Sequence, residues 1–588
     1  MEDKYIWDLT HIYKSKEDVN LAIEEAYKLL DEIKKYKGKL NESDDNIFEV
    51  YSLYEKILVI IEKVYGYAML DFHRDMSNQD AMKLYKKAEM LITECSEIVS
   101  FVSPELSEIS EDRLKLLLQE ERFAPFYREI EDIIKQKKHI LSKEIEEVLA
   151  KYAASFNVSE NVFDILTNTE FEFPKAEDSK GNLLEMSEGL FGKYLKGNDE
   201  VLRKNAYGSI YSLYKKHVNS ISELYLGRVK TRCTTSKLRN YSSSLEAATE
   251  ADDSNINVYK TLVNEVNNNL YVNHEYMKLK AKLLGKEKIH SYDMSVNTLD
   301  VEDTNIEYED ARKIVLDALK PMGEDYIKKL EYAFDNRWID VYERKNKMTG
   351  GYNMGVYGVH PYILLNYVKS LRDVSTIAHE LGHAMHSMYS SEKQNVFNSQ
   401  YTIMVAEVAS TVNEILLANY LIERETDNKK KAALITEQLD LIRATLIEQT
   451  KLAEFEENVH RRVEEGETLT AEDLNEIFFE LVKKYAGEAL EPEEESKYVW
   501  ARIPHFYRCF YVYKYATGIT SAIVIANKIL SGESGYVEKY KDMLSFGRTK
   551  DSVELLKMVD VDLENAETYK LAFKYYEDSL NKLKELLK

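Results

Sequence analysis

Two histidines four residues apart constrain this chain more than any other feature. Residues 379–383 read His-Glu-Leu-Gly-His, so three positions separate His379 from His383. An α-helix repeats every 3.6 residues, and side chains four apart therefore project from one face, one turn apart. From that face two neutral imidazoles can reach a single metal ion. The pattern predicts a helix at these residues with a metal site on one side of it.

The flanking sequence predicts the same helix. Ser370 is followed three residues later by Asp373, which is the spacing of a capping box at the start of a helix. Gly382 costs about 1 kcal/mol relative to alanine in a helix interior, and it is tolerable where another group must approach the backbone closely. Apolar residues recur at helical spacing through the stretch: Val374, Ile377, Ala378, Leu381, Ala384, Met385 and Met388.

Glu380 supplies a function that the two ligands lack. It is rotated by about a quarter turn from His379 around the helix axis, so its carboxylate can act on a water at the metal without being a ligand. Two ligands and one general base within five residues predict a zinc peptidase. The alternative is a helical interaction scaffold with a coincidental motif, because the chain has 12 histidines among 588 residues.

The third protein ligand stays open on the residues alone. A longer histidine motif fails, because the positions it would need are His386 and Tyr389. Three glutamates remain. Glu392 lies in a polar stretch that is expected to turn, whereas Glu407 and Glu414 lie seven residues apart in an apolar helical run and therefore face the same way.

A resemblance to a known family becomes specific here. His-Glu-Leu-Gly-His-Ala-Met-His at residues 379–386, followed by Ala-Glu-Val-Ala-Ser-Thr-Val-Asn-Glu at residues 406–414, resembles the oligoendopeptidase F family, relatives of thimet oligopeptidase. The resemblance covers nearly the whole chain and is tightest over residues 335–520. Further matching stretches are residues 7–10, 337–342, 360–366 and 503–507.

The resemblance implies a complete metal site with one zinc ion per chain. It assigns the third ligand to Glu407. Glu414 would then lie beside the site and orient a ligand histidine by accepting its other N–H. For His386 two interpretations remain, a position next to the ligands or simple packing, and we favour the first.

An aromatic cluster at residues 498–515 is the second candidate site. Composition alone favours core packing for most of these rings, although a histidine and tyrosines can donate hydrogen bonds to a developing oxyanion. The resemblance implies that one histidine and two tyrosines of this segment face the zinc, and these map onto His505, Tyr507 and Tyr513. A shorter spacing than in the thimet-like relatives keeps Tyr511 as an alternative.

Residues 336–368 are expected to form the main β-structure. Residues 362–365 predict a short apolar strand immediately before the metal helix. Such a strand can pair with an extended substrate or lie in the core under the helix, and both interpretations stay open. His360 and Tyr362 are the predicted substrate-binding residues. A small hairpin is expected near residues 171–186, around the turn at residues 178–181.

Composition bounds the remaining possibilities. Seven prolines and 21 glycines are few for this length, which favours helices. A net charge of −24 without a basic run argues against nucleic acid or an anionic membrane as a partner. Cys95, Cys233 and Cys509 are too widely spaced to predict a disulfide framework or a metal cluster. No signal peptide or membrane-spanning run stands out, so we expect a cytoplasmic protein.

The sequence therefore predicts a mainly α-helical metallopeptidase with a small β-sheet beside the zinc-binding helix. The resemblance adds two helical lobes around a deep substrate channel. It also suggests an N-terminal helical region at 1–110, an oligoendopeptidase F N-terminal subdomain at 111–200 and a zinc peptidase catalytic domain at 201–588. The predicted activity is endopeptidase cleavage of short oligopeptides. A zinc carboxypeptidase or dipeptidase is the alternative, and the oligomeric state stays open.

Overall fold

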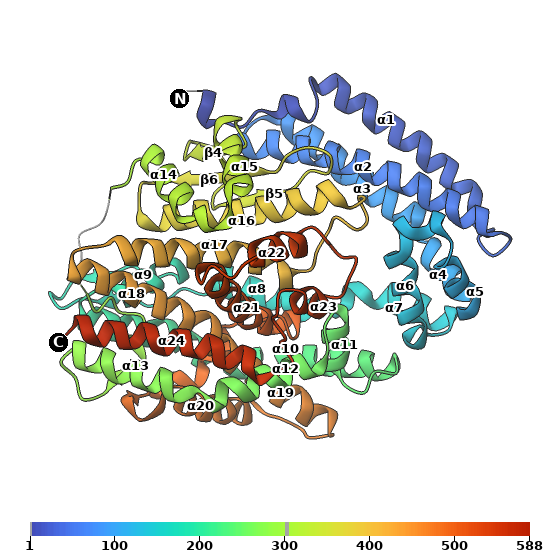
Figure 1. The fold of residues 1–588 in the computed structure, drawn as a ribbon. Helices are drawn as coiled ribbons and strands as arrows, with labels where there is room; N and C mark the ends of the chain where they lie inside the picture. Colours follow the sequence, from blue (N-terminus) through green and yellow to red (C-terminus); the bar gives the residue numbers. More distant parts are fainter. Residues whose placement is uncertain (1–2, 300–304) are drawn as a thin grey trace. The chain divides into compact units, whose positions relative to one another are not determined.

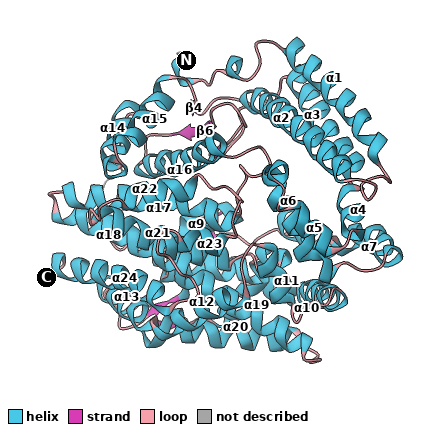
Figure 2. Cartoon of the chain, turned by 45° about the vertical axis from the view of Figure 1, so that its right-hand side comes forward, coloured by secondary structure: helices cyan, strands magenta, loops and turns pink. Residues whose placement is uncertain are grey.

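Helices dominate the computed structural model, which describes residues 3–299 and 305–588 (Figure 1). Figure 2 shows that the strands are few and short, so the mainly α-helical prediction is confirmed. The chain divides into two compact units, each built from three separate segments. Unit 1 comprises Met1–Lys138, Asp303–Tyr420 and Ile525–Val561, and unit 2 comprises His139–Glu302, Leu421–Val524 and Asp562–Lys588. The domain boundaries suggested at residues 110 and 200 stay a prediction.

Unit 1 begins with three long helices that pack side by side: α1 (Lys16–Ile33), α2 (Asp44–Arg74) and α3 (Gln79–Val99) (Figure 1). Each helix starts at a side-chain cap, which satisfies backbone N–H groups that would otherwise lack a partner. The other helices of this unit are α4 (Val102–Glu108), α5 (Glu111–Leu117), α6 (Tyr127–Gln136), α14 (Tyr308–Ala318), α15 (Glu324–Asp335), α16 (Leu371–Lys393), α22 (Tyr536–Leu544) and α23 (Ser552–Lys557), together with most of α17 (Ile403–Arg424).

A three-stranded sheet lies against α16 in unit 1. Its strand order is β4 (Ile339–Tyr342), β6 (Tyr362–Tyr367) and β5 (Tyr352–Met354), with β6 parallel to β4 and antiparallel to β5. The predicted sheet beside the metal helix is thus confirmed. Because β6 is the central strand, both of its edges are already paired. The interpretation that this strand pairs with an extended substrate is therefore not supported, and the core-strand interpretation holds.

Helix α16 begins and packs as the sequence predicts. Ser370 and Asp373 form the capping box at its start. At Gly382 the helix meets the backbone of α17, because a Cβ atom there would lie 2.6 Å from both the Ala409 carbonyl oxygen and the Ser410 Cα atom. The close approach expected at this glycine is therefore present. One turn before it, the Ala378 carbonyl accepts a hydrogen bond of 3.0 Å from the Asn413 amide of α17.

Unit 2 is built around the long helix α10 (Glu200–Leu238). The predicted hairpin is present, but its strands are β1 (Ala176–Glu177) and β2 (Leu183–Leu184), so the first strand lies later than residues 171–173. A second pair joins β3 (Ile289–His290) to β7 (Leu490–Glu491). The other helices are α7 (Lys143–Phe156), α8 (Val158–Ile165), α9 (Glu188–Lys196), α11 (Ser244–Ala251), α12 (Ile256–Asn268), α13 (Leu270–Leu283), α18 (Asn428–Ile442), α19 (Glu448–Glu464), α20 (Ala471–Ala486), α24 (Ala566–Leu586) and most of α21 (Tyr513–Leu530).

One helix in the described part of the chain, α17, is long and apolar enough to cross a membrane by length and composition. Its most apolar window is 56% buried within the protein, however, and the helix packs directly on α16. The core helix of a globular protein meets the same two criteria, so α17 is weak evidence for a membrane span.

The contact at Gly382 predicts that Gly382→Ala destabilises unit 1 by about 1–3 kcal/mol, because a rigid backbone cannot move aside for the new methyl group. We expect a lower midpoint of thermal unfolding, followed by circular dichroism. Gly208→Ala in α10 is the matched control, since nothing lies within 4 Å of its Cβ position. Alanine's higher helix propensity should leave that midpoint unchanged or raise it. Equal midpoints for both variants would contradict the packing argument.

Candidate metal centre

Three predicted ligands come together in unit 1. His379 and His383 on α16 and Glu407 on α17 each offer one donor atom, and these atoms all lie within 4.8 Å of one another. The Nε2 atom of His379 lies 3.9 Å from Oε2 of Glu407, and the Nε2 atom of His383 lies 4.0 Å from Oε1 of the same carboxylate. Two imidazole nitrogens and one carboxylate oxygen are a donor set that fits a zinc ion.

The remaining atom of each histidine is held by the protein. The Nδ1 atom of His379 lies 3.4 Å from Oε1 of Glu414, and His383 hydrogen-bonds to the backbone carbonyl of Ala406. These partners fix the ring orientations and leave Nε2 of each ring facing Glu407. Burial lowers the pKa of His383 to about 4, so this imidazole is neutral at neutral pH, as a metal ligand must be.

The two glutamates of α17 take different positions. Glu407 faces both histidines through their Nε2 atoms, whereas Glu414 reaches only the Nδ1 atom of His379, on the opposite side of that ring. Burial alone would lower the pKa of His379, but nearby carboxylates, with Glu414 first, outweigh it and raise that pKa. The geometry therefore separates the predicted ligand from the predicted orienting residue, a distinction that a seven-residue spacing cannot make.

Glu380 lies outside the donor group but next to it. Its side chain is buried, and a backbone N–H of Asn353 on β5 donates to its carboxylate. Burial, together with the negative charges of Glu407 and Glu414, raises the pKa of Glu380 to about 7 against the opposing effect of His379. A carboxylate with such a pKa is suited to take up and release a proton near neutrality.

His386 is packed rather than placed among the ligands. Its ring is 1% exposed and stacks on Tyr401, with 3.6 Å between the ring centroids and 6° between the planes. It is absent from the donor group of His379. The stacking supports the packing interpretation, whereas His383 is close enough to act on the charge of His386, so the position next to the predicted ligands stays a prediction.

The predicted substrate-binding residues are engaged in the core of unit 1. Tyr362 is fully buried, and its hydroxyl donates to the Asp8 carbonyl at 2.9 Å. The His360 ring stacks on Trp338, and its two nitrogens lie within hydrogen-bonding distance of His11 and the Pro361 carbonyl. Their role in binding substrate stays a prediction, and this packing does not favour it.

The aromatic segment belongs to unit 2 and arranges its tyrosines differently from the sequence-based assignment. Tyr507 and Tyr513 are buried, and the Tyr513 hydroxyl donates to Asp252 at 3.0 Å. The Tyr507 hydroxyl is also buried, with no hydrogen-bond partner among the described residues. Neither hydroxyl is open to a peptide in this arrangement, which does not favour these two tyrosines as catalytic donors, and their role stays a prediction.

His505 has two half-buried tyrosines as neighbours. Its ring stacks on Tyr511 with centroids 5.8 Å apart and meets Tyr515 edge-on at 6.0 Å. Tyr511 was the alternative kept open by the shorter spacing, whereas Tyr515 was missed. Because these tyrosines are four residues apart, a helical reading of the segment would have put them on one face.

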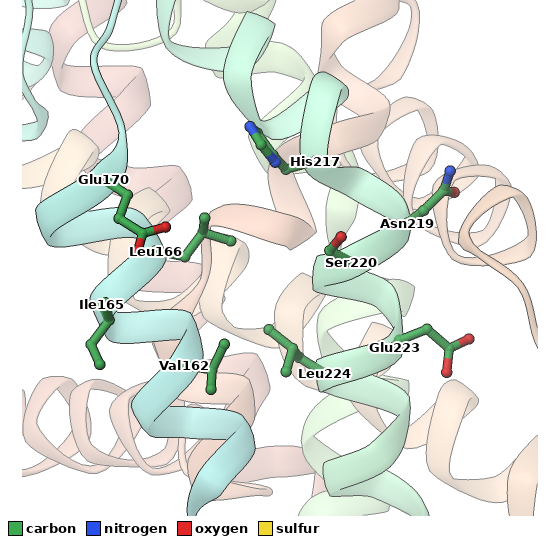
Figure 3. A pocket seen from close by; sticks show the side chains of 9 residues that line it. All are labelled: Val162, Ile165, Leu166, Glu170, His217, Asn219, Ser220, Glu223 and Leu224. Carbon is green, nitrogen blue, oxygen red and sulfur yellow. The ribbon is translucent and has the colours of Figure 1, made fainter.

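A groove of about 790 Å³ lies elsewhere in unit 2 (Figure 3). Val162 and Leu166 point from one wall toward Leu224 of α10, and Glu170 and His217 line the same space. None of the predicted site residues lines this groove. The α16–α17 contact is the stronger candidate site, because donor atoms that could hold a metal ion and a buried carboxylate converge there.

Comparison with known proteins decides the family. A sequence model described as peptidase family M3 matches residues 193–575, which is more than half of the chain. The chain belongs to peptidase family M3. A second model, described as oligopeptidase F, matches residues 105–173 of the M3 peptidase. The resemblance read from the motifs is therefore confirmed.

Individual relatives align with this chain over nearly its whole length. The M3 peptidase is 34% identical over 582 residues to oligopeptidase PepF of Bacillus subtilis (strain 168), an alignment that covers 99% of this chain and 87% of the relative. A crystal structure from Chlamydophila abortus is 30% identical, with a TM-score of 0.94 and coverage of 100% and 99%. Oligoendopeptidase-F from Enterococcus faecium is 32% identical, with a TM-score of 0.74 and coverage of 97% and 99%.

Membership of this family makes the protein a metalloendopeptidase, and the family implies a metal ion, generally zinc. The donor group of His379, His383 and Glu407 fits that ion by its chemistry and by the convergence of its atoms.

Because the two glutamates of α17 take different positions, replacing each of them should reduce zinc affinity to a different extent. Glu407→Ala is expected to lose the tightly bound zinc of this centre, whereas Glu414→Ala should weaken zinc binding by about 10–100-fold, because only the orientation of His379 suffers. Chelator competition measures both affinities. Glu392→Ala is the control, since this exposed residue of α16 pairs with Lys329 instead. Parent-like zinc binding at this centre in Glu407→Ala, together with loss of that zinc in Glu414→Ala, would reverse the assignment.

Proposed function

We propose that this M3 peptidase is a zinc endopeptidase that hydrolyses short oligopeptides. The observation that carries the proposal is the convergence of His379, His383 and Glu407 beside the buried carboxylate of Glu380. The substrate class is supported by the relatives, which are named oligopeptidase PepF and oligoendopeptidase-F and align over nearly the whole chain.

His379, His383 and Glu407 would hold one catalytic zinc ion per chain. When bound, zinc lowers the pKa of water and polarises the scissile carbonyl. Three protein ligands leave a fourth position open, as catalytic zinc sites require. The rings of His379 and His383 donate hydrogen bonds to the Glu414 carboxylate and the Ala406 carbonyl, and these bonds keep both Nε2 atoms directed at Glu407.

Glu380 acts as the general base in this proposal. Its carboxylate accepts the proton of the attacking water and passes it to the leaving amine, which requires a pKa near neutrality. Burial raises the pKa of Glu380 to about 7, which meets that requirement. The Asn353 N–H holds the carboxylate in place on the side of α16 that faces β5.

His505 and Tyr511 are the proposed donors to the oxyanion of the tetrahedral intermediate. The family resemblance supports the histidine, and the stacking of the two rings supports Tyr511 in place of Tyr507 and Tyr513. The His505 ring is partly buried, which lowers its pKa and favours the neutral form. A neutral imidazole still donates one hydrogen bond, so the proposed role does not require a charge.

The net charge of the chain bears on its proposed compartment and on the partners it would avoid. A net charge of −24 supports a freely diffusing protein that avoids phosphate backbones and anionic membranes, so we propose a cytoplasmic peptidase without a nucleic-acid partner. A zinc carboxypeptidase or dipeptidase with similar chemistry is the remaining alternative for the activity.

Replacing the proposed base should separate catalysis from metal binding. Glu380→Gln is expected to lose at least about 100-fold in kcat while it keeps zinc and fold, because the amide cannot accept the water proton. Steady-state kinetics and a zinc assay on the same sample measure this. Glu392→Gln, an equal change at an exposed position of α16, should leave both values unchanged. Turnover of Glu380→Gln within a few-fold of the parent would exclude the assigned role.

Substrate tests distinguish the endopeptidase from its alternative. An internally quenched peptide of about ten residues with both ends blocked should be cleaved, because an endopeptidase needs no free terminus. We expect denatured casein to be spared, since the resemblance implies an enclosed channel that admits only short chains. Cleavage that requires a free terminus would favour the carboxypeptidase or dipeptidase, and efficient digestion of casein would contradict the channel.

A further inference from the structure

A second group of metal-binding side chains lies in unit 2. Glu456 and His460 are four residues apart on α19, so they share a helix face just as His379 and His383 do on α16. Cys509 comes from the turn before α21. One donor atom from each of Glu456, His460 and Cys509 lies within 4.8 Å of the others. No residue of this group belongs to the centre already described.

Two of these side chains are buried with one polar atom left unpaired. Glu456 is 0% exposed and His460 is 1% exposed. Oε1 of Glu456 accepts the Phe510 N–H at 2.6 Å, and Nδ1 of His460 lies 3.0 Å from the Ser244 hydroxyl. Oε2 of Glu456 and Nε2 of His460 have no hydrogen-bond partner within residues 3–299 and 305–588.

Buried polar atoms without a hydrogen-bond partner indicate that another group fills the space beside them. A polar atom left without a partner costs about 1–3 kcal/mol each, so such atoms in a folded protein indicate a water or an ion. In both Glu456 and His460, one side-chain polar atom has a hydrogen-bond partner in the described part of the protein and the other has none. A metal-ligating side chain shows the same division, because a neighbour orients the atom that does not bind the metal.

The third donor reaches the group through an unfavourable backbone conformation. Cys509 has a φ of 20° and Phe510 a φ of 59°, and neither is a glycine. Such conformations cost about 1–3 kcal/mol each and persist where the surroundings hold them. The Glu456 carboxylate holds the Phe510 N–H, and the Phe510 ring packs 4.5 Å from the His460 ring. The turn therefore brings the Cys509 thiol to the two helix residues.

We infer that Glu456, His460 and Cys509 bind a second metal ion of the zinc class. A thiolate, an imidazole and a carboxylate are all ligands that zinc accepts in proteins, whereas magnesium and calcium prefer oxygen donors alone. The ion would join α19 to the segment that carries His505, so its expected role is structural. This inference does not depend on the proposed catalytic mechanism.

The positive charges around the group are compatible with a dication. Arg228 and Arg232 act on the Cys509 thiol and on His460, and Lys514 acts on Glu456. Zinc bound by one thiolate, one carboxylate and one neutral imidazole carries no net charge, so the arginines would face a neutral assembly. Arg228 and Arg232 favour the ionised thiol that ligation requires, and Lys514 and Arg232 favour the ionised carboxylate.

Binding would exchange protons for the metal. Burial raises the pKa of the Cys509 thiol to about 12 and that of the Glu456 carboxyl to about 8. Both groups are therefore largely protonated at neutral pH when no metal is bound. Ligation forms one sulfur–metal and one oxygen–metal bond and releases these two protons to solvent.

Cobalt substitution tests the site by its colour. A cobalt ion bound to a thiolate shows a near-ultraviolet charge-transfer band, and the His379 centre cannot produce this band because it contains no thiol. We expect the full-length protein, reconstituted with Co²⁺, to show the band, and we expect Cys509→Ser to lose it. Cys95→Ser and Cys233→Ser are matched controls. Both control variants should keep the band. Cys95 lies in unit 1, outside the unit that contains the group. Of the His460 ring nitrogens, Cys233 contacts only Nδ1, and in its absence the Ser244 hydroxyl still reaches that atom.

Metal counting gives an independent result. The parent should bind two zinc ions per chain, the double variant His379→Ala/His383→Ala one, and that variant with Cys509→Ser none. If Cys509→Ser does not fold, the variant Cys95→Ser/Cys233→Ser leaves Cys509 as the sole thiol, and a band in that protein assigns it. One zinc per parent chain and no thiolate band would mean that water alone fills the group, and would overturn the inference.

Discussion

The proposed catalytic centre depends on the close contact between α16 and α17. At Gly382 the two backbones approach so closely that a single methyl group would overlap main-chain atoms of Ala409 and Ser410. This contact brings the carboxylates of α17 to the imidazoles of α16, since Glu407 and Glu414 lie on either side of that crossing along the chain. Without it, the two histidines would still share a helix face, but the third donor and the orienting carboxylate would be missing.

Part of this arrangement was readable from the sequence because it is local. The helix, its capping box and the shared face of His379 and His383 follow from spacings of three and four residues, which a helix converts directly into geometry. The choice between Glu407 and Glu414 was not readable in this way. Residues seven apart face the same way, so only the packing of the second helix decides which carboxylate reaches both rings.

Three features of the structure could not be read from local patterns in the sequence. The orientation of Tyr507 is one of them, because residues 504–510 form a short helical turn and a strained turn, in which neither helical nor strand periodicity applies. The place of β6 in its sheet is another, since the sequence does not say whether a strand is central or at an edge. The Glu456–His460–Cys509 group was missed because its cysteine is distant in sequence and its helix pair lacks the neighbouring glutamate that made the first motif recognisable.

The hydrogen bonds behind the two proposed ligand histidines would affect how the enzyme gains and loses a metal ion. Glu414 and the Ala406 carbonyl restrain the rings of His379 and His383 from behind, so the rotamer entropy of both side chains is lost on folding rather than on binding. Removal and rebinding of the ion should then leave the surrounding helices folded, because the site is already in its binding geometry before the metal arrives. A pool of inactive but intact enzyme would be restored by metal supply alone.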